Sequence, residues 1–381
     1  MTGDNPTGDL RFAVIGCGVI GSQHADVISA GTGMTLSAVA DVVLDRAEAL
    51  ADAVVARHGG PRPAVLRSVD EALARSDVDA VAICVPSGLH ADLAVAALEA
   101  GRYTIIEKPV DVTVAAARRV ADAAASAPNG ALAAVISQHR YDLASQIVHR
   151  AIEDGRLGRI TSAVASLSWW RGQAYYDSGD WRGTWALDGG GALMNQGVHT
   201  VDLLLWFLGR PVEVYAHTAL LAHERVEVED TAVATVRFAN GALATVHATT
   251  AAYPGVSARV QVHGSRGSAI IDNDELTYFH AAAEGDVLAA HGVTGSGNQV
   301  EAELGGAAAG GGDLFSGQSR QYVDILRSFA AGTSPLVDVE QATLALATIR
   351  AVYLSAQRGV PVLIDDVLAD KIEADTDGVT A

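Results

Sequence analysis

The feature that most constrains the fold of this 381-residue chain is a glycine-rich turn in the segment RFAVIGCGVIG, at residues 11–21. Apolar residues typical of a buried strand precede the turn, and a helical pattern follows it. Gly16, Gly18 and Gly21 have the spacing G-x-G-x-x-G. In this spacing the first glycine permits a tight turn, the second lets a ligand approach the backbone, and the third lets the helix pack closely on the strand. The segment therefore predicts a strand, a turn and a helix whose N-terminus faces a phosphate.

An acidic residue extends this pattern to a dinucleotide site. Asp41 ends the second predicted strand, about 20 residues beyond the last glycine, where an acid bonds the ribose hydroxyls. The carboxylate favours NAD over NADP because it would oppose a 2′-phosphate, although Arg46 in the next helix could still reach one. The alternative is an ordinary strand-to-helix connection. We expect the cofactor to contact Gly16, Gly18, Val19, Ile20, Gly21, Asp41 and Arg46.

Alternating patterns predict the fold of the first part of the chain. From residue 11 to about residue 138, short apolar runs alternate with helical patterns, which is typical of βαβ units and a parallel sheet. We expect an α/β Rossmann domain with a doubly wound parallel sheet. Its six strands are expected at residues 11–16, 35–41, 64–67, 80–85, 103–107 and 132–137.

The pattern then changes to alternating strands, after an amphipathic helix expected at residues 143–154. Asn240-Gly241 predicts a hairpin, and Gly264 to Gly267 predicts another turn between strands. These signals predict an α+β domain with a large open, mostly antiparallel sheet, completed by helices at residues 318–331 and 339–357. The Gly- and Ala-rich stretch at 281–312 is either a mobile flap or a disordered surface insertion.

We therefore expect two domains between two tails. The expected ranges are a flexible N-terminal tail at 1–10, a dinucleotide-binding domain at 11–138, a substrate-binding domain at 139–365 and a flexible C-terminal tail at 366–381.

Composition excludes several classes of protein. The formal net charge of −19 opposes binding to nucleic acid, which depends on Lys and Arg neutralising phosphates. No apolar run approaches the ~20 residues that span a bilayer. The polar N-terminus lacks the features of a secretory signal, and the two cysteines suit a reducing compartment without metal-ligand spacing. We expect a cytoplasmic protein with no metal site and no nucleic-acid or membrane partner.

Two further motifs carry a resemblance to a known family. They are VPSGLH at residues 85–90 with TIIEKP at 104–109, and WRGTWALDGGGALMNQGVHTVDLL at 181–204. With the glycine-rich turn, they make residues 11–365 resemble the Gfo/Idh/MocA family, which includes glucose-fructose oxidoreductase and inositol dehydrogenase. The resemblance implies a Rossmann domain followed by an open sheet that binds substrate and pairs subunits, as a homodimer or homotetramer. It also implies oxidation or reduction of a secondary alcohol on a sugar, cyclitol or similar polyol.

The EKP motif supplies the first candidate catalytic residue. The resemblance implies that Lys108 lies beside the nicotinamide and the substrate, and that the Lys108-Pro109 bond is often cis. The position of Lys108 after the fifth predicted strand agrees with this role, because the carboxyl ends of strands in an open α/β sheet face the ligand crevice. A lysine in a confined site can remove a hydroxyl proton; otherwise Lys108 is a solvated residue before a proline. The motifs further assign Pro86, Ser87, His90, Glu107, Lys108 and Gln138 to the cofactor, although Ser87, His90 and Gln138 could equally be loop or cap residues.

The second candidate is His199, which the resemblance implies is the acid/base. Asn195 and His199 are one turn apart on a helix expected to start near Gly191, so they share a face, and Asp202 could orient the imidazole ring. The alternative is a histidine of the core. Family members often carry Asp at the position of Asn195. Because Asn cannot act as a base, we expect Asn195 to position the substrate, and the resemblance of its motif to sugar-nucleotide 3-dehydrogenases favours a hexose or hexose derivative.

Aromatic and arginine side chains gather just before the GGG motif. Sugars stack on aromatic rings, and arginine suits a carboxylate or a phosphate. The alternative is an aromatic packing cluster at a domain junction. We expect substrate contacts from Trp170, Arg171, Tyr176, Trp181 and Arg182, together with Asn195 and His199.

Three functions compete. The first is an NAD-dependent dehydrogenase or ketoreductase acting on a carbohydrate secondary alcohol, with Lys108 and His199 in proton transfer. The second is a glycosidase in which bound NAD oxidises the sugar transiently. The third is a non-catalytic regulator that binds NAD or sugar, and the presence of both Lys108 and His199 argues against it.

Overall fold

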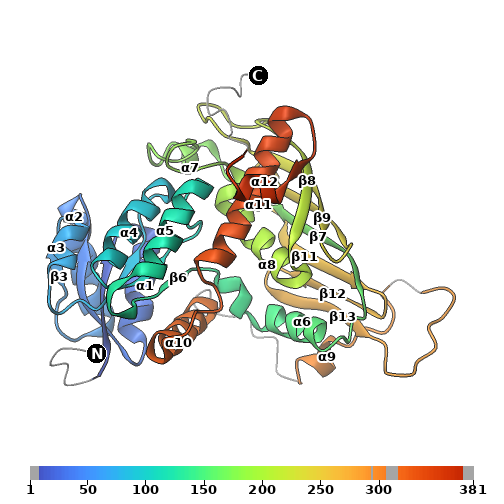
Figure 1. Ribbon diagram of the computed structural model, residues 1–381, viewed down its shortest axis with the longest axis horizontal. Helices are drawn as coiled ribbons and strands as arrows, with labels where there is room; N and C mark the ends of the chain where they lie inside the picture. The colour runs from blue at the N-terminus through green and yellow to red at the C-terminus, as the bar shows by residue number, and fades with distance from the viewer. Residues whose placement is uncertain (1–7, 293–294, 306–315, 372–381) are drawn as a thin grey trace. The chain divides into compact units, whose positions relative to one another are not determined.

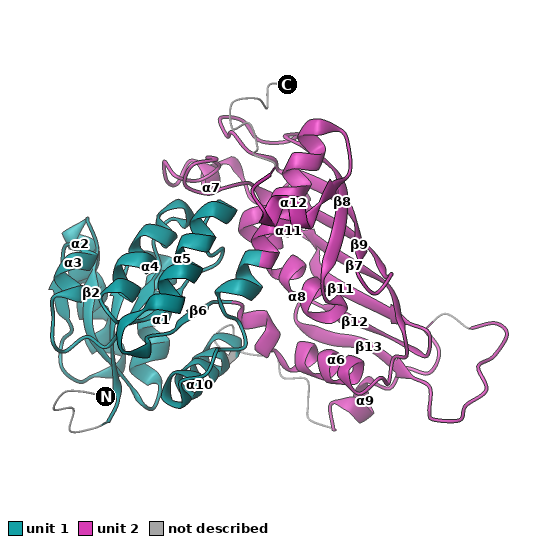
Figure 2. Ribbon diagram, viewed as in Figure 1, with its two compact units in different colours: residues 1–136, 314–343 teal, residues 137–313, 344–381 magenta. Residues whose placement is uncertain are grey.

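The computed structural model describes residues 8–292, 295–305 and 316–371, which form two compact units. Unit 1 comprises Met1–Ile136 and Leu314–Thr343, and unit 2 comprises Ser137–Asp313 and Leu344–Ala381 (Figure 2). The expected tails at 1–10 and 366–381 lie largely outside the described residues, as do positions 293–294 and 306–312 of the Gly- and Ala-rich stretch.

Unit 1 contains the predicted parallel sheet. Its six strands have the order β3-β2-β1-β4-β5-β6, and every pairing is parallel. The order reverses direction between β1 and β4, and ligands of open α/β sheets bind at the carboxyl ends of the strands at such a point. The expectation of a doubly wound α/β domain is confirmed. The strands are β1 (Leu10–Ile15), β2 (Met34–Ala40), β3 (Ala64–Leu66), β4 (Ala80–Ile83), β5 (Tyr103–Ile106) and β6 (Ala133–Val135).

Helices cover this sheet (Figure 1). One of them, α10 (Ser316–Ala331), was expected to complete the second domain, but it joins the core of unit 1 instead. Its Tyr322, Ile325 and Phe329 recur at helical spacing and are buried against Phe12 and the side chains around it. The other helices are α1 (Val19–Ala30), α2 (Leu44–His58), α3 (Val69–Leu73), α4 (His90–Glu99) and α5 (Val114–Ser126), with 3-10 turns at η1 (Ser87–Leu89) and η2 (Pro128–Gly130).

Unit 2 is built on an eight-stranded sheet in the order β13-β12-β11-β7-β10-β9-β8-β14. All its pairings are antiparallel except that of β10 with β7, so the expected mostly antiparallel sheet is confirmed. The predicted turn at Asn240-Gly241 joins β9 to β10. The strands are β7 (Ile160–Ser168), β8 (Pro211–Ala219), β9 (Thr231–Phe238), β10 (Leu243–Thr249), β11 (Ser257–Gly264), β12 (Gly267–Asp272), β13 (Glu275–Ala281) and β14 (Val362–Leu363).

The helices of unit 2 differ from expectation at one important point. The segment after Gly191 begins as a π-helix, η4 (Ala192–Gly197), and only then becomes the α-helix α8 (Val198–Leu208), which packs on β7 and β11. Among the described residues, no helix is both long and apolar enough to cross a membrane. The remaining helices are η3 (Gln138–Tyr141), α6 (Leu143–Glu153), α7 (Gln173–Tyr176), α9 (Val300–Glu303), α11 (Val339–Arg358), whose first residues belong to unit 1, and α12 (Ile364–Leu368).

Candidate functional site

The glycine-rich turn of unit 1 has the geometry that its spacing predicts. Gly16 has a φ of 94°, and a Cβ there would lie 2.7 Å from the carbonyl oxygen of Cys84. A Cβ on Gly21 would lie 1.8 Å from the carbonyl oxygen of Gly16. A Cβ on Gly18, by contrast, would meet nothing within 4 Å. The first and third glycines are therefore required by packing, whereas the space beside Gly18 is open to a ligand.

The N-terminus of α1 fits a pyrophosphate. The helix begins at Val19, and its N-cap residue, Gly18, makes no side-chain capping bond. Its first N–H groups therefore lack a side-chain acceptor, which is the arrangement that binds anions at helix N-termini. Val19 is 75% exposed and Ile20 is 39% exposed, so the turn is open to solvent.

Asp41 lies beside this turn. Its Oδ2 accepts a hydrogen bond of 2.8 Å from the N–H of Cys17, and its Oδ1 accepts one of 2.8 Å from the N–H of Val43. Each carboxylate oxygen has a second lone pair, so the side chain can also accept bonds from ribose hydroxyls. Arg46 is exposed in the first turn of α2. The turn, the helix terminus and Asp41 together fit a dinucleotide.

The EKP motif follows β5 and is held by a buried network that the sequence did not predict. Glu107 Oε1 lies 2.9 Å from Nε2 of His24, and Nδ1 of His24 lies 2.6 Å from the hydroxyl of Tyr322. Burial alone raises the pKa of Glu107, but the hydrogen bond from His24 and the charges of His24 and Lys108 outweigh it, so this pKa lies below its ordinary value. Glu107 therefore anchors the motif as a carboxylate.

Lys108 stands out within this buried motif. Every other residue from position 104 to position 112 is buried, and Lys108 is only half-buried. Its peptide bond to Pro109 is cis, as the family resemblance implies. The ring of His90 joins two neighbouring strand ends, because its Nδ1 lies 2.7 Å from the carbonyl oxygen of Pro109 and its Nε2 lies 2.9 Å from that of Val85. Pro86 and Ser87 lie between these contacts, at the start of η1.

In unit 2, Asn195 and His199 share one face of the π- and α-helical segment. They are the two residues of 191–205 that are not buried. Asn195 Nδ2 donates to Oδ1 of Asp188 at 2.5 Å, and its Oδ1 accepts a bond of 3.2 Å from Nε2 of Gln196. The amide of Asn195 is thus held in one orientation by two buried polar neighbours.

The expectation that Asp202 orients His199 is wrong. Asp202 accepts hydrogen bonds from Nε and Nη2 of Arg140, at 2.8 and 2.6 Å, and a further one from Ser137. Arg140 is 2% exposed, and a buried guanidinium needs a charged partner. The ring beside His199 belongs instead to His139, with the ring centroids 4.8 Å apart and the planes at 75°.

His139 carries a positive charge at ordinary pH. Burial lowers its pKa, but hydrogen bonds from Nδ1 to Asp142 and Asp274, both 2.9 Å, outweigh this and raise the pKa to about 10. One ligand atom from each of these three residues lies within 4.8 Å of the others, a spacing that could also hold a metal ion. The Nδ1–H group of His139 is shared between the two carboxylates.

Glu229 fixes the start of the helical segment that carries Asn195 and His199. Its carboxylate accepts hydrogen bonds from the N–H groups of Gly191 and Leu193, at 2.8 and 2.9 Å, and one from the Tyr353 hydroxyl at 3.1 Å. The carboxyl group is fully buried, and burial raises its pKa to about 7. Glu229 lies two residues before β9, where an acid gives no local signal for this role, so the sequence did not predict it.

The raised pKa of Glu229 predicts how stability depends on pH. The folded state holds a proton that the unfolded chain releases near its ordinary pKa of 4.5. This contribution to the free energy of unfolding, on the order of 3 kcal/mol, is therefore fully present below pH 4.5 and is lost as the pH rises through about 7. Urea unfolding across this range should show a weaker decline for Glu229→Gln than for the wild type. The exposed Glu224→Gln is the control, and equal pH dependence in all three proteins would contradict the assignment.

The aromatic segment before the GGG motif is largely a packed cluster. Tyr176 is 6% exposed, its hydroxyl lies 2.7 Å from Oγ1 of Thr250, and burial raises its pKa to about 12. Trp170 packs edge-on against Tyr253 at 5.4 Å. Arg182 lies over Tyr175 and Trp181, and Arg171 over Trp169 and Tyr175.

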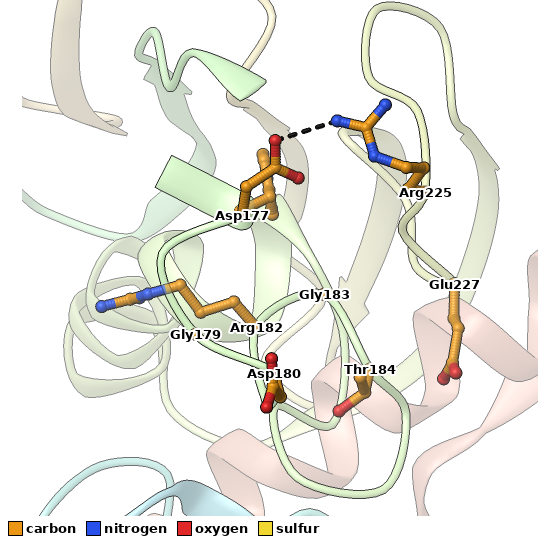
Figure 3. Close-up of a pocket in the computed structure, with 9 residues that line it drawn as sticks. Asp177, Gly179, Asp180, Arg182, Gly183, Thr184, Arg225 and Glu227 are labelled. Atoms are coloured by element: carbon orange, nitrogen blue, oxygen red, sulfur yellow. Dashed lines mark hydrogen bonds and ion pairs between the residues drawn. The ribbon is translucent and has the colours of Figure 1, made fainter. Parts of the chain in front are cut away.

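A hollow of about 310 Å³ opens beside this cluster (Figure 3). Asp177 and Arg225 form an ion pair of 2.9 Å at its rim, and the side chain of Arg182 extends away from them. The lining residues are Tyr176, Asp177, Gly179, Asp180, Arg182, Gly183, Thr184, Arg225 and Glu227.

Comparison with known proteins identifies relatives of both units. Residues 10–135 match the family described as an oxidoreductase family with an NAD-binding Rossmann fold, and residues 145–270 match the GFO/IDH/MocA C-terminal domain. Inositol 2-dehydrogenase of Rhizobium meliloti is 29% identical over 69% of this chain and 76% of its own length. Inositol 2-dehydrogenase 2 of Saccharopolyspora erythraea is 30% identical over 68% and 72%. The WlbA dehydrogenase from Bordetella pertussis, solved with NADH and UDP-GlcNAcA, has a TM-score of 0.77 and 29% identity over 93% of this chain and 98% of its own.

Proposed function

The chain belongs to the GFO/IDH/MocA family of NAD-binding oxidoreductases, and we propose that it transfers a hydride between NAD and a secondary hydroxyl or ketone. The substrate is a sugar, a sugar derivative or a cyclitol. The observation that carries the proposal is the glycine-rich turn, with open space beside Gly18 and an N-terminus of α1 without a side-chain cap. Relatives named for inositol, and one solved with NADH and UDP-GlcNAcA, support this substrate range.

Two residues are proposed to move the proton. When bound, the nicotinamide accepts or donates the hydride, while Lys108 and His199 remove or return the proton of the substrate hydroxyl. The exposure of Lys108 within a buried motif supports its role, as does the shared open face of His199 and Asn195. Asn195, held by Asp188 and Gln196, positions the substrate.

Other residues are proposed to hold the cofactor. The N–H groups at Gly18 to Gly21 receive the pyrophosphate, and Asp41 receives the ribose hydroxyls. Oε1 of Gln138 is buried without a hydrogen-bond partner, which leaves an acceptor for a ligand. Pro86 and Ser87 are proposed to contact the cofactor from the segment after β4, while Glu107 and His90 hold the EKP motif in place.

The test is a screen of sugars, sugar derivatives and polyols with purified protein and NAD, followed by the absorbance of reduced nicotinamide. Net reduction of NAD supports the dehydrogenase. Release of an aglycone from glycosides without net change in the cofactor would favour the NAD-dependent glycosidase, and binding without either reaction would favour a regulator. A cytoplasmic location and a homodimer or homotetramer are further proposals, tested by fractionation and by light scattering.

Asp41 is expected to determine the preference for NAD over NADP. Asp41→Asn keeps an acceptor for one backbone N–H and removes the charge that opposes a 2′-phosphate. The ratio of kcat/KM with NADP to that with NAD should rise at least about tenfold, which corresponds to about 1.4 kcal/mol. The control is Asp45→Asn, at an exposed position of α2. An unchanged ratio in Asp41→Asn would contradict the assignment.

A further inference from the structure

We infer that Arg171 and Arg182 bind an anionic group of the substrate, a carboxylate or a phosphate, at a fixed position relative to Asn195. The inference rests on the proposed function and specifies its substrate class as a charged sugar rather than a neutral one. All the residues that carry it belong to unit 2.

The two guanidinium groups share one aromatic ring. The Arg182 guanidinium carbon lies 4.3 Å from the ring centroid of Tyr175, and that of Arg171 lies 5.3 Å from the same centroid. Each arginine also contacts a tryptophan. The Arg182 guanidinium carbon lies 4.4 Å from the Trp181 ring centroid, and that of Arg171 lies 5.1 Å from the Trp169 ring centroid. Both guanidinium groups are therefore held against the Tyr175 ring, with their carbons less than about 10 Å apart. Two like charges at this spacing repel each other and attract an anion.

No carboxylate of the described residues forms an ion pair with Arg171 or Arg182, whereas Arg140 and Arg225 each form one. Arg182 donates only to hydroxyl groups, to Tyr175 at 2.7 Å and to Ser178 at 3.1 Å. Two arginines without an ion pair are unexpected in a chain with a net charge of −19.

The guanidinium group of Arg171 makes fewer hydrogen bonds than that of Arg182. Among the described residues the buried Nε of Arg171 has no hydrogen-bond partner, and its Nη1 donates a long bond of 3.3 Å to the carbonyl oxygen of Trp170. Buried polar groups are normally paired, and an unpaired guanidinium carries a desolvation penalty. A bound carboxylate would offset one of the two positive charges, and a phosphate monoester would offset most of both. Either group would accept charge-assisted hydrogen bonds from the terminal nitrogens of both arginines.

A chain of hydrogen bonds connects this pair to the candidate substrate-positioning residue. The Tyr175 hydroxyl accepts from Arg182, and it also lies 3.1 Å from Nε2 of Gln196. Gln196 in turn donates to Asn195, whose amide nitrogen donates to Asp188. Asp188 is already occupied, because its other oxygen accepts the Gly183 N–H at 2.9 Å. The chain fixes the distance from the anion to the group that Asn195 holds, so the site selects where on the sugar the charge lies.

The test compares matched hexoses. Initial rates with NAD are measured for D-glucose, D-glucuronate and D-glucose 1-phosphate, and binding of the last two to the NADH-loaded protein is measured by calorimetry. Arg171→Met and Arg182→Met remove the charge and keep the length of the side chain. Arg237→Met is the control, because Arg237 is exposed on β9, does not line the hollow and pairs with Glu213.

We expect kcat/KM for one of the two anionic hexoses to exceed that for glucose by at least about tenfold. Each of the two arginine variants should lower kcat/KM for this anionic hexose by about 10- to 100-fold, chiefly by raising KM. The same variants should leave kcat/KM for glucose within about twofold of the wild-type value. Preference for glucuronate identifies a carboxylate, and preference for the 1-phosphate identifies a phosphate. Arg237→Met should leave kcat/KM for the neutral and the anionic hexoses at the wild-type values.

Two outcomes overturn the inference. One is equal kcat/KM for the neutral and anionic hexoses, and the other is binding of the anions that Arg171→Met and Arg182→Met leave unchanged. Failure of the proposed function is a separate result, because it requires that no sugar or polyol, myo-inositol included, reduces NAD. In that case arginine-dependent binding of an anionic hexose, measured by calorimetry, still supports the site.

Discussion

Replacement of Lys108 by alanine is expected to lower kcat by about 10³-fold while the protein still folds and binds NAD. Proton transfer by a positioned side chain contributes roughly 10²- to 10⁴-fold to catalysis. The change should spare the fold, because the backbone of the motif is held independently of this side chain. The Lys108 N–H donates to Glu107 at 3.1 Å, Glu107 is anchored on His24, and His90 contacts the carbonyl of Pro109.

The measurements are steady-state rates against pH, together with the dissociation constant for NADH from fluorescence titration. Lys108→Arg preserves a positive charge but cannot release a proton, so it should retain NADH binding and lose most of the rate. Lys371→Ala changes the other lysine of the chain, which is exposed, and should behave as the wild type. A Lys108→Ala protein that binds NADH and turns over at the wild-type rate would refute the catalytic assignment.

Gly191→Ala is expected to destabilise unit 2 by about 3 kcal/mol or more and to abolish most activity. A Cβ at this position would lie 1.6 Å from the carbonyl oxygen of Glu229 and 2.9 Å from its Oε2. The Glu229 carbonyl belongs to the backbone and cannot rotate out of the way as a flexible side chain can. The new Cβ must therefore push the segment at position 191 away from Glu229. That separation would break the hydrogen bonds that fix the start of η4 and would displace Asn195 and His199.

Urea unfolding and steady-state kinetics measure the two effects together. The matched control is Gly172→Ala, where the new Cβ would meet only Nε1 of Trp170, at 3.8 Å. Glu229→Gln should show a smaller loss, since an amide oxygen still accepts one of the backbone bonds. Wild-type stability and kcat in Gly191→Ala would mean that Glu229 does not support this helical segment.

The sequence by itself determined the helices, the strands and the two kinds of sheet, because these signals are local, but it did not determine that α10 packs in unit 1. Strand periodicity, the spacing of Gly16, Gly18 and Gly21 and the Asn240-Gly241 turn depend on residues close together in the chain, and each predicted element appears within a few residues of its expected bounds. The EKP and GGG motifs located the candidate catalytic residues in the same way. Lys108 is singled out by exposure within its motif, as are Asn195 and His199 within theirs.

Only the tertiary structure decided which side chains support these residues. His24 pairs with Glu107 and with Tyr322, and the latter is 298 positions away in sequence. Asp202 was expected beside His199 but pairs with buried Arg140. A buried charged side chain needs a hydrogen-bonded partner, and the fold supplies that partner from any part of the chain. Local sequence patterns therefore do not show which residue the partner is. Local patterns therefore predicted the glycine-rich turn, whereas the networks around the candidate site arise from long-range packing.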